Sequence, residues 1–263
     1  MVSEGDGSIS TSVNGDPSYN ARTTRRAVAL LMSDSKKRLG DVSIYQRVGT
    51  PIGSGFGASA ASATSAVYAV ARAAGIRGQK KDLAMYAYNA EILEQTGLGT
   101  VSVVYGAAGA GAIIRGGAPG RARFLTVPVP NDLRMVTAFI APYDKKEALS
   151  SPKMSERINR LGKASLEAYL SDPSLDSLAA EGEKFSRRLG LETPEVKKLI
   201  GVAKGAGAFR ASQNMIGYAI HSLVYGAAFL KVAEALKKVG PEVRVDTFEV
   251  GSKKAGLVET SRR

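Results

Sequence analysis

The chain contains no cysteine, no tryptophan and a single histidine. The absence of cysteine excludes disulfides, thiolate metal sites and cysteine nucleophiles, and it fits a cytoplasmic protein, which is the location that we expect. With one histidine the chain also lacks the usual ligands of a zinc site. That histidine, His221, stands in an apparent strand, and we expect it to be a packed or edge residue rather than a general base.

Long hydrophobic runs are absent as well, because no uninterrupted apolar stretch approaches the length of a membrane-spanning helix. Residues 1–10 have neither the basic nor the apolar region of a secretory signal. These absences predict a soluble protein without a membrane partner. With 263 residues, of which 44% are hydrophobic, the chain can bury a sizeable core as one large domain or two smaller ones.

Acidic residues are few beside basic ones, with 24 Asp and Glu against 36 Lys and Arg and a formal net charge of +12. Such a charge is typical either of nucleic-acid binding or of a protein that attracts small anions such as ATP and carboxylates. The basic residues occur in scattered pairs, without a basic tail or an aromatic RNA-binding motif. We therefore expect small anionic ligands and no nucleic-acid partner.

The first half of the chain has the pattern of helices around one strand and a glycine-rich loop. A turn signal at residues 14–17 precedes a helix that we expect from about Ser18. Residues 41–48 alternate like a short strand and lead into the loop. Residues 58–75 are rich in alanine and end at a glycine, which predicts a helix with a small-residue face, and residues 79–95 form the next expected helix.

The second half of the chain changes from strands to helices and back. From residue 131 onward the expected order is a strand, several charged helices, two strands, a helix and a last strand, which predicts an α+β domain of the split β-α-β, ferredoxin-like kind. We divide the chain into a first domain at 1–129 and a second at 130–263. The expected strands cover 112–117, 122–129 and 133–141, helices fall within 153–204 with breaks at 171–173 and 193–194, two extended pieces flank Gly217, and a helix at 226–240 precedes a strand at 241–250.

Four glycines and several small side chains are concentrated in residues 49–63, GTPIGSGFGASAASA. Successive glycine N–H groups can approach phosphate because no Cβ intrudes, and the positive end of the following helix adds to the attraction. The stretch lacks the Gly-Lys-Ser/Thr of a Walker A loop. Gly53, Gly55 and Ala58 match a dinucleotide fingerprint, but two consecutive helices follow where that fold needs a second strand. The alternative is a small-residue turn before a tightly packed helix.

Residues 51–63 resemble the Pro-x-x-x-Gly-Leu-Gly-Ser-Ser-Ala-Ala loop of the GHMP kinases, the superfamily of galactokinase, homoserine kinase and mevalonate kinase. Three further stretches are similar to segments of the archaeal pantoate kinases: EILEQTGLGTV at 91–101, IIRGGAPG at 113–120 and ASQNMIGYAIHSLV at 211–224. The resemblance implies an α+β, two-domain GHMP kinase fold, with a ribosomal S5 domain 2-like N-terminal lobe and a ferredoxin-like C-terminal lobe. It also implies ATP- and Mg²⁺-dependent phosphorylation of (R)-pantoate to 4-phosphopantoate for coenzyme A synthesis.

The same resemblance implies roles for individual residues. Glu91 would bind Mg²⁺ together with Ser59; Glu94, one turn on, is its rival, and a solvated helix carboxylate is the alternative reading. Apart from the resemblance, Arg115 and Arg121 stand beside a Gly-Ala-Pro-Gly turn and are candidates for binding the substrate carboxylate through a bidentate pair, with surface solvation as the alternative. The ATP phosphates would lie on Gly53, Ser54, Gly55, Phe56, Gly57, Ala58 and Ser59.

Two departures from the family pattern accompany these assignments. Thr100 stands where the pattern has an aspartate that contacts the substrate hydroxyl, and a threonine can position a hydroxyl but cannot take its proton near neutral pH. The early strands of the N-terminal lobe are expected to be missing from this chain. Two alternatives therefore stay open, another GHMP-type small-molecule kinase and a catalytically impaired nucleotide-binding paralogue. A homodimer is the expected assembly.

Overall fold

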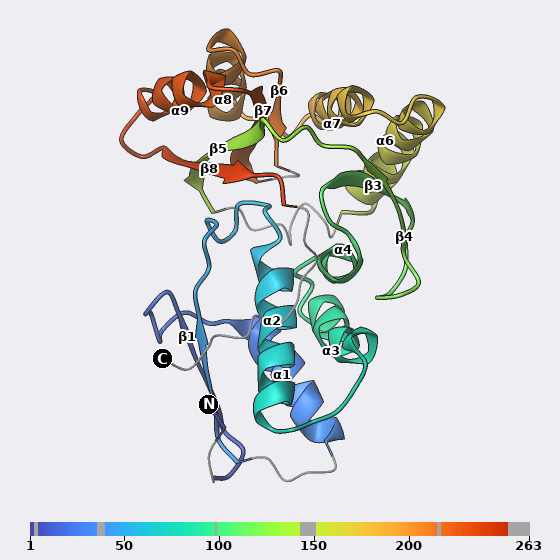
Figure 1. Ribbon diagram of the computed structural model, residues 1–263, viewed down its shortest axis with the longest axis vertical. Coiled ribbons are helices and arrows are strands. Elements are labelled where there is room, and N and C mark those ends of the chain that lie inside the picture. The colour runs from blue at the N-terminus through green and yellow to red at the C-terminus, as the bar shows by residue number, and fades with distance from the viewer. Residues whose placement is uncertain (3–4, 36–39, 98, 143–150, 215–216, 252–263) are drawn as a thin grey trace.

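The structure of the chain is a computed structural model that describes residues 1–263 except 3–4, 36–39, 98, 143–150, 215–216 and 252–263. In the described part, the N-terminal half groups several helices beside a short sheet, and the C-terminal half forms a second sheet covered by helices (Figure 1). Three stretches of the sequence predictions lie outside the described residues: Leu98 of the 91–101 motif, residues 215–216 of the 211–224 motif, and the end of the expected second domain.

The N-terminal sheet consists of two parallel strands, and three helices pack against one another beside it. The first helix begins at Arg22 rather than near Ser18, because the Ser18 N–H and Oγ both donate to Asp16 Oδ1 and close a turn there. A fourth, short helix was not expected, since one of this length has too few residues to show a period. The elements are β1 (Ile9–Val13), α1 (Arg22–Asp34), β2 (Val42–Gln46), α2 (Ala58–Ala73), α3 (Lys80–Leu93) and α4 (Thr100–Gly106).

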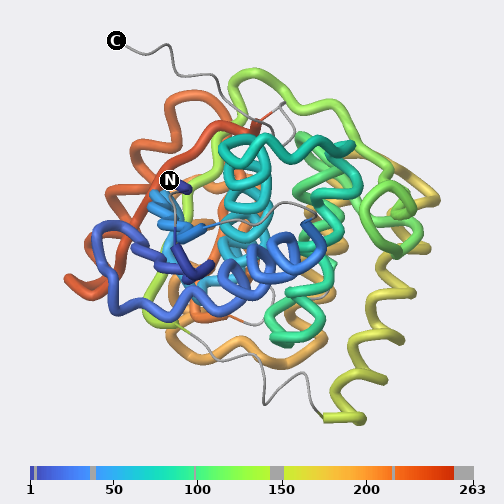
Figure 2. Tube along the Cα trace, turned by 90° about the horizontal axis from the view of Figure 1, so that it is seen from below, coloured from blue at the N-terminus to red at the C-terminus, as the bar shows by residue number. Residues whose placement is uncertain are grey.

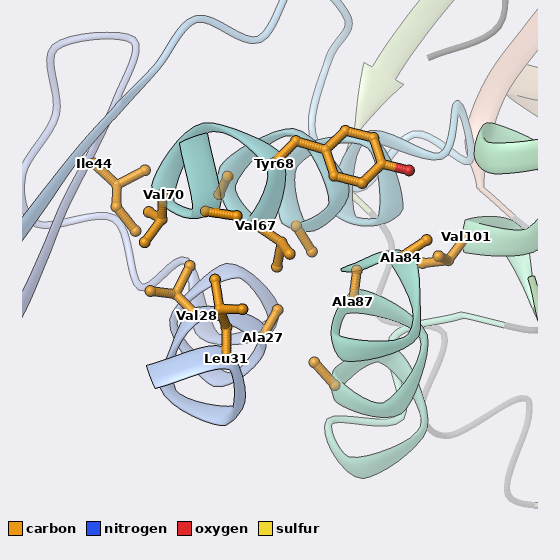
Figure 3. Packing of buried hydrophobic residues seen from close by; sticks show 14 of the residues in the cluster. Ala27, Val28, Leu31, Ile44, Val67, Tyr68, Val70, Ala84, Ala87 and Val101 are labelled. Atoms are coloured by element: carbon orange, nitrogen blue, oxygen red, sulfur yellow. The ribbon is translucent and has the colours of Figure 1, made fainter. Parts of the chain in front are cut away.

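Small side chains allow these helices to pack closely. The predicted small-residue face of α2 is buried, and alanines of α3 such as Ala84 and Ala87 face it, while Leu31 and Val28 of α1 fill the space below (Figure 3). A methyl group projects little from the helix backbone, so neighbouring helices approach closely without leaving a void. The close packing brings the first turns of α1 and α2 near the end of α3.

The C-terminal sheet is antiparallel with strand order β6-β7-β5-β8. Helices follow its first and third strands in chain order, which is the expected ferredoxin-like arrangement, and the α+β fold class is confirmed. Before it, a hairpin of β3 (Ala110–Arg115) and β4 (Arg123–Val127) joins the two halves. The sheet strands are β5 (Leu133–Ala141), β6 (Arg210–Gln213), β7 (Tyr218–Tyr225) and β8 (Arg244–Glu249). The division of domains near residue 130 stays a prediction.

Three helices of the C-terminal half begin close to the predicted positions, whereas the expected helix at 226–240 is shorter and runs from Ala228 to Lys237. The N-caps of the three are Ser151, Ser174 and Thr193, whose side chains accept first-turn N–H groups, and proline follows two of them. In Figure 1, α8 and α9 cover the face of the sheet that lies away from the N-terminal half. Figure 2 shows α6 at the periphery, in keeping with its one buried residue, Tyr169. The helices are α6 (Pro152–Ser171), α7 (Leu175–Leu189), α8 (Pro194–Gly205) and α9 (Ala228–Lys237).

Candidate active site

Three glycines of the loop between β2 and α2 adopt left-handed backbone angles. The φ angle is 78° at Gly53, 85° at Gly55 and 74° at Gly57. Other residue types rarely adopt these angles, so the shape of the loop depends on glycine. Gly57 is also the N-cap of α2, and because it has no side chain it leaves the first-turn N–H groups of the helix open to the adjacent cavity. The loop and the helix end together form a surface that attracts anions.

A cavity of about 230 Å³ opens in front of this loop. Every residue from Gly53 to Ser59 lines it, and so do Glu91 and Thr100. The structure therefore brings together the residues that the sequence assigned to ATP phosphate, metal and catalysis. The opposite wall is formed by the start of α1, the end of β2 and the turn after α3. Among the described residues that line the cavity, Arg22 and Glu91 are the charged ones.

A chain of hydroxyl groups joins the first turns of α1 and α2. Ser59 Oγ donates to Thr23 Oγ1 at 3.0 Å, and Thr23 Oγ1 lies 2.9 Å from Thr96 Oγ1. A hydroxyl that donates its hydrogen keeps two lone pairs, so Ser59 Oγ retains the capacity to coordinate a cation. Thr24, beside Thr23, donates to Gln46 Oε1 at 3.2 Å and so ties α1 to the end of β2. These bonds hold Ser59 in a defined position at the cavity wall.

The two rival carboxylates of α3 have different surroundings. Glu91 is only 2% exposed, its Oε2 accepts from the Val101 N–H at 3.3 Å, and its side chain packs against Gly97, where a Cβ would meet Oε1 at 1.9 Å. Glu94 instead accepts from Arg26 Nε at 2.9 Å and lies outside the cavity lining. The geometry therefore favours Glu91 over Glu94 as the cation ligand. It also contradicts the reading of Glu91 as a solvated helix residue.

Thr100 lies beside the glycine loop at the start of α4. A Cβ built on Gly57 would lie 3.0 Å from Thr100 Cγ2, so the threonine methyl group faces the loop. The next residue, Val101, donates to Glu91, and an aspartate in place of Thr100 would therefore bring a second negative charge close to a buried carboxylate. The position of Thr100 suits contact with a bound substrate, and its catalytic role stays a prediction.

Arg115 and Arg22 differ in their relation to the cavity. Arg115 ends β3, is exposed, pairs with Arg123 across the hairpin and does not line the cavity. Arg22 is the first residue of α1 and does line it. The N-cap of α1 is Ala21, which has no capping side chain, so the positive end of the helix dipole lies at the same helix start as Arg22. The structure thus adds Arg22 as a candidate for binding an anionic substrate, while the role of Arg115 stays a prediction.

Sequence reasoning missed the polar residues of the opposite wall. Arg22, Thr23 and Gln46 lie in no motif that the sequence analysis assigned to the site, and Thr96, although it lies in the 91–101 stretch, was given no role there. Thr23 and Thr96 are separated by 73 positions. Ordinary helix and strand residues become neighbours here only through the packing of α1, β2 and α3. The sequence offered one signal, the adjacent hydroxyl residues Thr23 and Thr24 in the first turn of α1. The N-cap of that helix, Ala21, has no side-chain oxygen that could accept from the first-turn N–H groups.

His221 lies in the middle of the C-terminal sheet, on the inner strand β7, opposite Ser212 of β6 and Thr137 of β5. It is half-buried, and its Nδ1 lies 2.7 Å from Asn214 Oδ1. Burial lowers the pKa of His221 below its ordinary value, and the Glu183 carboxylate of α7 offsets this only in part. The folded protein therefore favours neutral histidine.

We expect the free energy of unfolding to fall as the pH drops below about 6.5, the ordinary pKa of histidine. In this range the unfolded chain binds a proton on His221 that the folded chain, with its lower pKa, does not bind. Stability is then lost at up to about 1.4 kcal/mol per pH unit until the folded pKa is reached. Urea unfolding between about pH 5.5 and 7.5 measures this slope. The variant His221→Phe should lack it, and an unchanged slope would contradict the expectation.

The comparisons with known proteins agree with this geometry. Residues 22–107 match the family described as the GHMP kinases N terminal domain. The N-terminal half of the chain is therefore similar to the N-terminal domain of GHMP kinases. The matched residues run from the start of α1 to the residue after α4 and include the glycine loop, Glu91 and Thr100. The candidate site therefore lies in the part of the chain that matches the family model.

Individual relatives extend the likeness beyond the matched domain. A mevalonate kinase of Pyrococcus horikoshii is 26% identical over 209 residues, which are 73% of this chain and 62% of the relative. A solved phosphotransferase related to the CoA biosynthesis pathway has a TM-score of 0.82 at 23% identity, over 97% of this chain and 83% of its own. A homoserine kinase of Cytophaga hutchinsonii has a TM-score of 0.67 at 18% identity, over 96% of this chain and 85% of its own. The chain thus spans less than two thirds of the curated relative, and the solved structures establish its fold.

GHMP kinases are phosphotransferases that use ATP, generally with Mg²⁺. The site fits that pair, because it offers glycine N–H groups and a helix end to phosphate, and a hydroxyl and a carboxylate to a hard cation that keeps several waters. The described residues hold no group of three or more acidic, histidine or cysteine side chains arranged for a metal, so a cation here would depend on few protein ligands. In the same residues, no helix combines the length and apolarity needed to cross a bilayer.

Proposed function

We propose that this protein is a GHMP kinase that phosphorylates (R)-pantoate on its terminal hydroxyl and so makes 4-phosphopantoate for coenzyme A synthesis. The observation that carries the proposal is the likeness of the whole fold to the CoA-pathway phosphotransferase, at a TM-score of 0.82 against 0.63 to 0.67 for homoserine, mevalonate and galactose kinases. The site adds a chemical argument, since an acceptor with a carboxylate and a hydroxyl would find a cation at Arg22 and a hydroxyl at Thr100 in one cavity.

The residues divide the work of positioning the two substrates. The N–H groups of the glycine loop and of the start of α2 would bind the ATP phosphates, and Ser59 and Glu91 would hold Mg²⁺. Bound Mg²⁺·ATP supplies the phosphoryl group and neutralises part of its charge. Arg22 would hold the acceptor carboxylate, and Thr100 would orient the acceptor hydroxyl by a hydrogen bond. Phosphoryl transfer needs mainly such positioning and charge neutralisation, so the site can work without a strong base.

The direct test is ADP release by the purified protein with Mg²⁺·ATP and a panel of pantoate, homoserine, mevalonate and galactose. We expect turnover with pantoate and at least about tenfold lower kcat/KM with the others. Turnover with another panel member alone would favour the alternative of a different GHMP-type kinase. A folded protein that binds ATP but turns over no acceptor would favour the impaired paralogue.

Arg22→Ala should raise KM for pantoate by about tenfold or more and leave KM for ATP within about twofold, because it removes a charge-assisted hydrogen bond to the acceptor only. Arg115→Ala is the matched control, since it removes an arginine that lies outside the cavity lining. Steady-state kinetics with each substrate varied in turn distinguishes the two. A larger effect from Arg115→Ala would return the substrate role to that residue.

Thr100→Val should lower kcat by about tenfold, because it keeps the shape of the side chain and removes the hydroxyl that orients the acceptor. Thr100→Asp should change kcat by no more than a few-fold if positioning suffices. The impaired-paralogue alternative predicts instead that Thr100→Asp gives a large gain in turnover. Single-turnover measurements with saturating ATP separate these outcomes from changes in binding.

A further inference from the structure

The glycine loop meets the C-terminal sheet at a close backbone contact. A Cβ built on Gly55 would lie 2.7 Å from the Asn214 carbonyl oxygen, and one on Gly217 would lie 3.0 Å from the Ser54 carbonyl oxygen. Asn214 follows β6, and Gly217 precedes β7. The loop that lines the cavity therefore also rests on Asn214 and Gly217, which flank the ends of β6 and β7.

The side chain of Asn214 fixes this contact. Its Nδ2 donates to the Ser54 carbonyl oxygen at 3.4 Å, which turns Oδ1 toward His221 Nδ1 at 2.7 Å. Because Oδ1 can only accept, His221 Nδ1 must carry the hydrogen. The backbone of Asn214 is fixed as well, since its N–H donates to the Ala219 carbonyl and its own carbonyl accepts from the Gly217 N–H.

His221, which makes that hydrogen bond, is itself held in a fixed position by the sheet. It stands on an inner strand, with Thr137 on one side and Ser212 on the other, both buried. Asn214 is 6% exposed and Ser54 is 1% exposed, so the bonds from His221 to the loop lie largely out of water. A hydrogen bond in such surroundings meets little competition from solvent, and removing one partner leaves the other unsatisfied.

We infer that His221 and Asn214 are positioning residues that hold the glycine loop in its anion-binding shape from the C-terminal sheet. A loop with three left-handed glycines has many other conformations available when nothing restrains it. The His221–Asn214–Ser54 series restrains it at Ser54, the residue between Gly53 and Gly55. The consequence for nucleotide binding rests on the proposed function, whereas the restraint itself concerns the protein without nucleotide.

The restraint can be tested first without ATP. In protein labelled with ¹⁵N at histidine, the only histidine should give one slowly exchanging Nδ1–H signal, and Asn214→Ala should abolish it. His221→Phe should shift the amide signals of Gly53, Gly55 and Gly57, because the loop loses its support. Thr137→Val is the matched control, a buried substitution of similar shape beside His221 on β5 that no described contact joins to Asn214. It should leave the glycine signals in place.

The consequence for binding is measured by calorimetry with Mg²⁺·ATP. Asn214→Ala and His221→Phe should each weaken ATP binding by about two- to tenfold, the equivalent of one hydrogen bond, and the double variant should be no weaker than either single one. His221→Asn, whose amide nitrogen occupies the place of Nδ1, should restore part of the loss.

Two results would overturn the inference. One is a set of glycine signals that His221→Phe leaves unchanged, and the other is additive losses of affinity in the double variant. If the wild-type protein binds no ATP while the histidine signal and its loss in Asn214→Ala are seen, the proposed function fails and the positioning link stands.

Discussion

Replacing Glu91 by glutamine is expected to lower kcat by about 100-fold or more, the usual effect of removing one charged group that stabilises a transition state. The carboxylate is buried at the wall of the cavity that the glycine loop also lines, and glutamine keeps its size while removing its charge. A metal that has lost this ligand would neutralise less of the charge on the phosphates. The measurement is steady-state ADP release over a range of Mg²⁺ concentrations.

Glu94→Gln is the matched control, because it makes the same chemical change one turn further along α3. Glu94 pairs with a half-exposed Arg26 outside the cavity, and exposed ion pairs contribute little to stability. Its kcat should stay within about twofold of the wild-type value. Circular dichroism on both variants checks that the overall helix content is unchanged. Equal losses in the two variants would remove Glu91 from its proposed role as cation ligand.

Gly55→Ala should combine a loss of stability with a loss of ATP binding. Alanine at a φ of 85° costs about 1 to 2 kcal/mol, and its Cβ would also lie 2.7 Å from the Asn214 carbonyl oxygen, which belongs to backbone and cannot easily move away. The loop must therefore shift, and the N–H groups that face the cavity shift with it. We expect ATP affinity to fall by about 100-fold, measured by calorimetry on protein that is shown to be folded.

Gly15→Ala separates the two causes. Gly15 has nearly the same backbone angle, with φ at 88°, but its Cβ would meet nothing within 4 Å, and it lies in a turn and not in the cavity lining. This variant should lose the about 1 to 2 kcal/mol that the backbone angle costs and keep its affinity for ATP. An equal fall in affinity would mean that Gly55→Ala acts through general instability rather than through the loop.

Much of the fold could be predicted from local patterns. The alanine-rich period of 58–75, the capping residues with proline at the starts of α6 and α8, and the alternation of the last strands each depend on near neighbours in sequence. The sequence prediction placed the start of α1 too early, because Asp16 and Ser18 form a turn where the first residues of the helix were expected. The helix α4 was missed because a single short turn has no period to recognise.

The glycine loop was also predictable, because its features depend on near neighbours in sequence. Its backbone angles require glycine, and its place before a helix can be read along the chain. The opposite wall could not be predicted, since Arg22, Thr23 and Thr96 are common residues that only helix packing brings together. Sequence also left Glu91 and Glu94 as rivals, because both lie on the same helix one turn apart. Burial separated them.

The sequence by itself determined the class of fold and the resemblance to the GHMP kinases, and it located the glycine loop, because these depend on residue type and spacing along one continuous segment. Tertiary structure decided which carboxylate and which arginine line the cavity, and it joined His221 through Asn214 to a loop about 160 positions away. Contacts of this second kind depend on which faces of distant helices and strands meet. No pattern within a single segment records them.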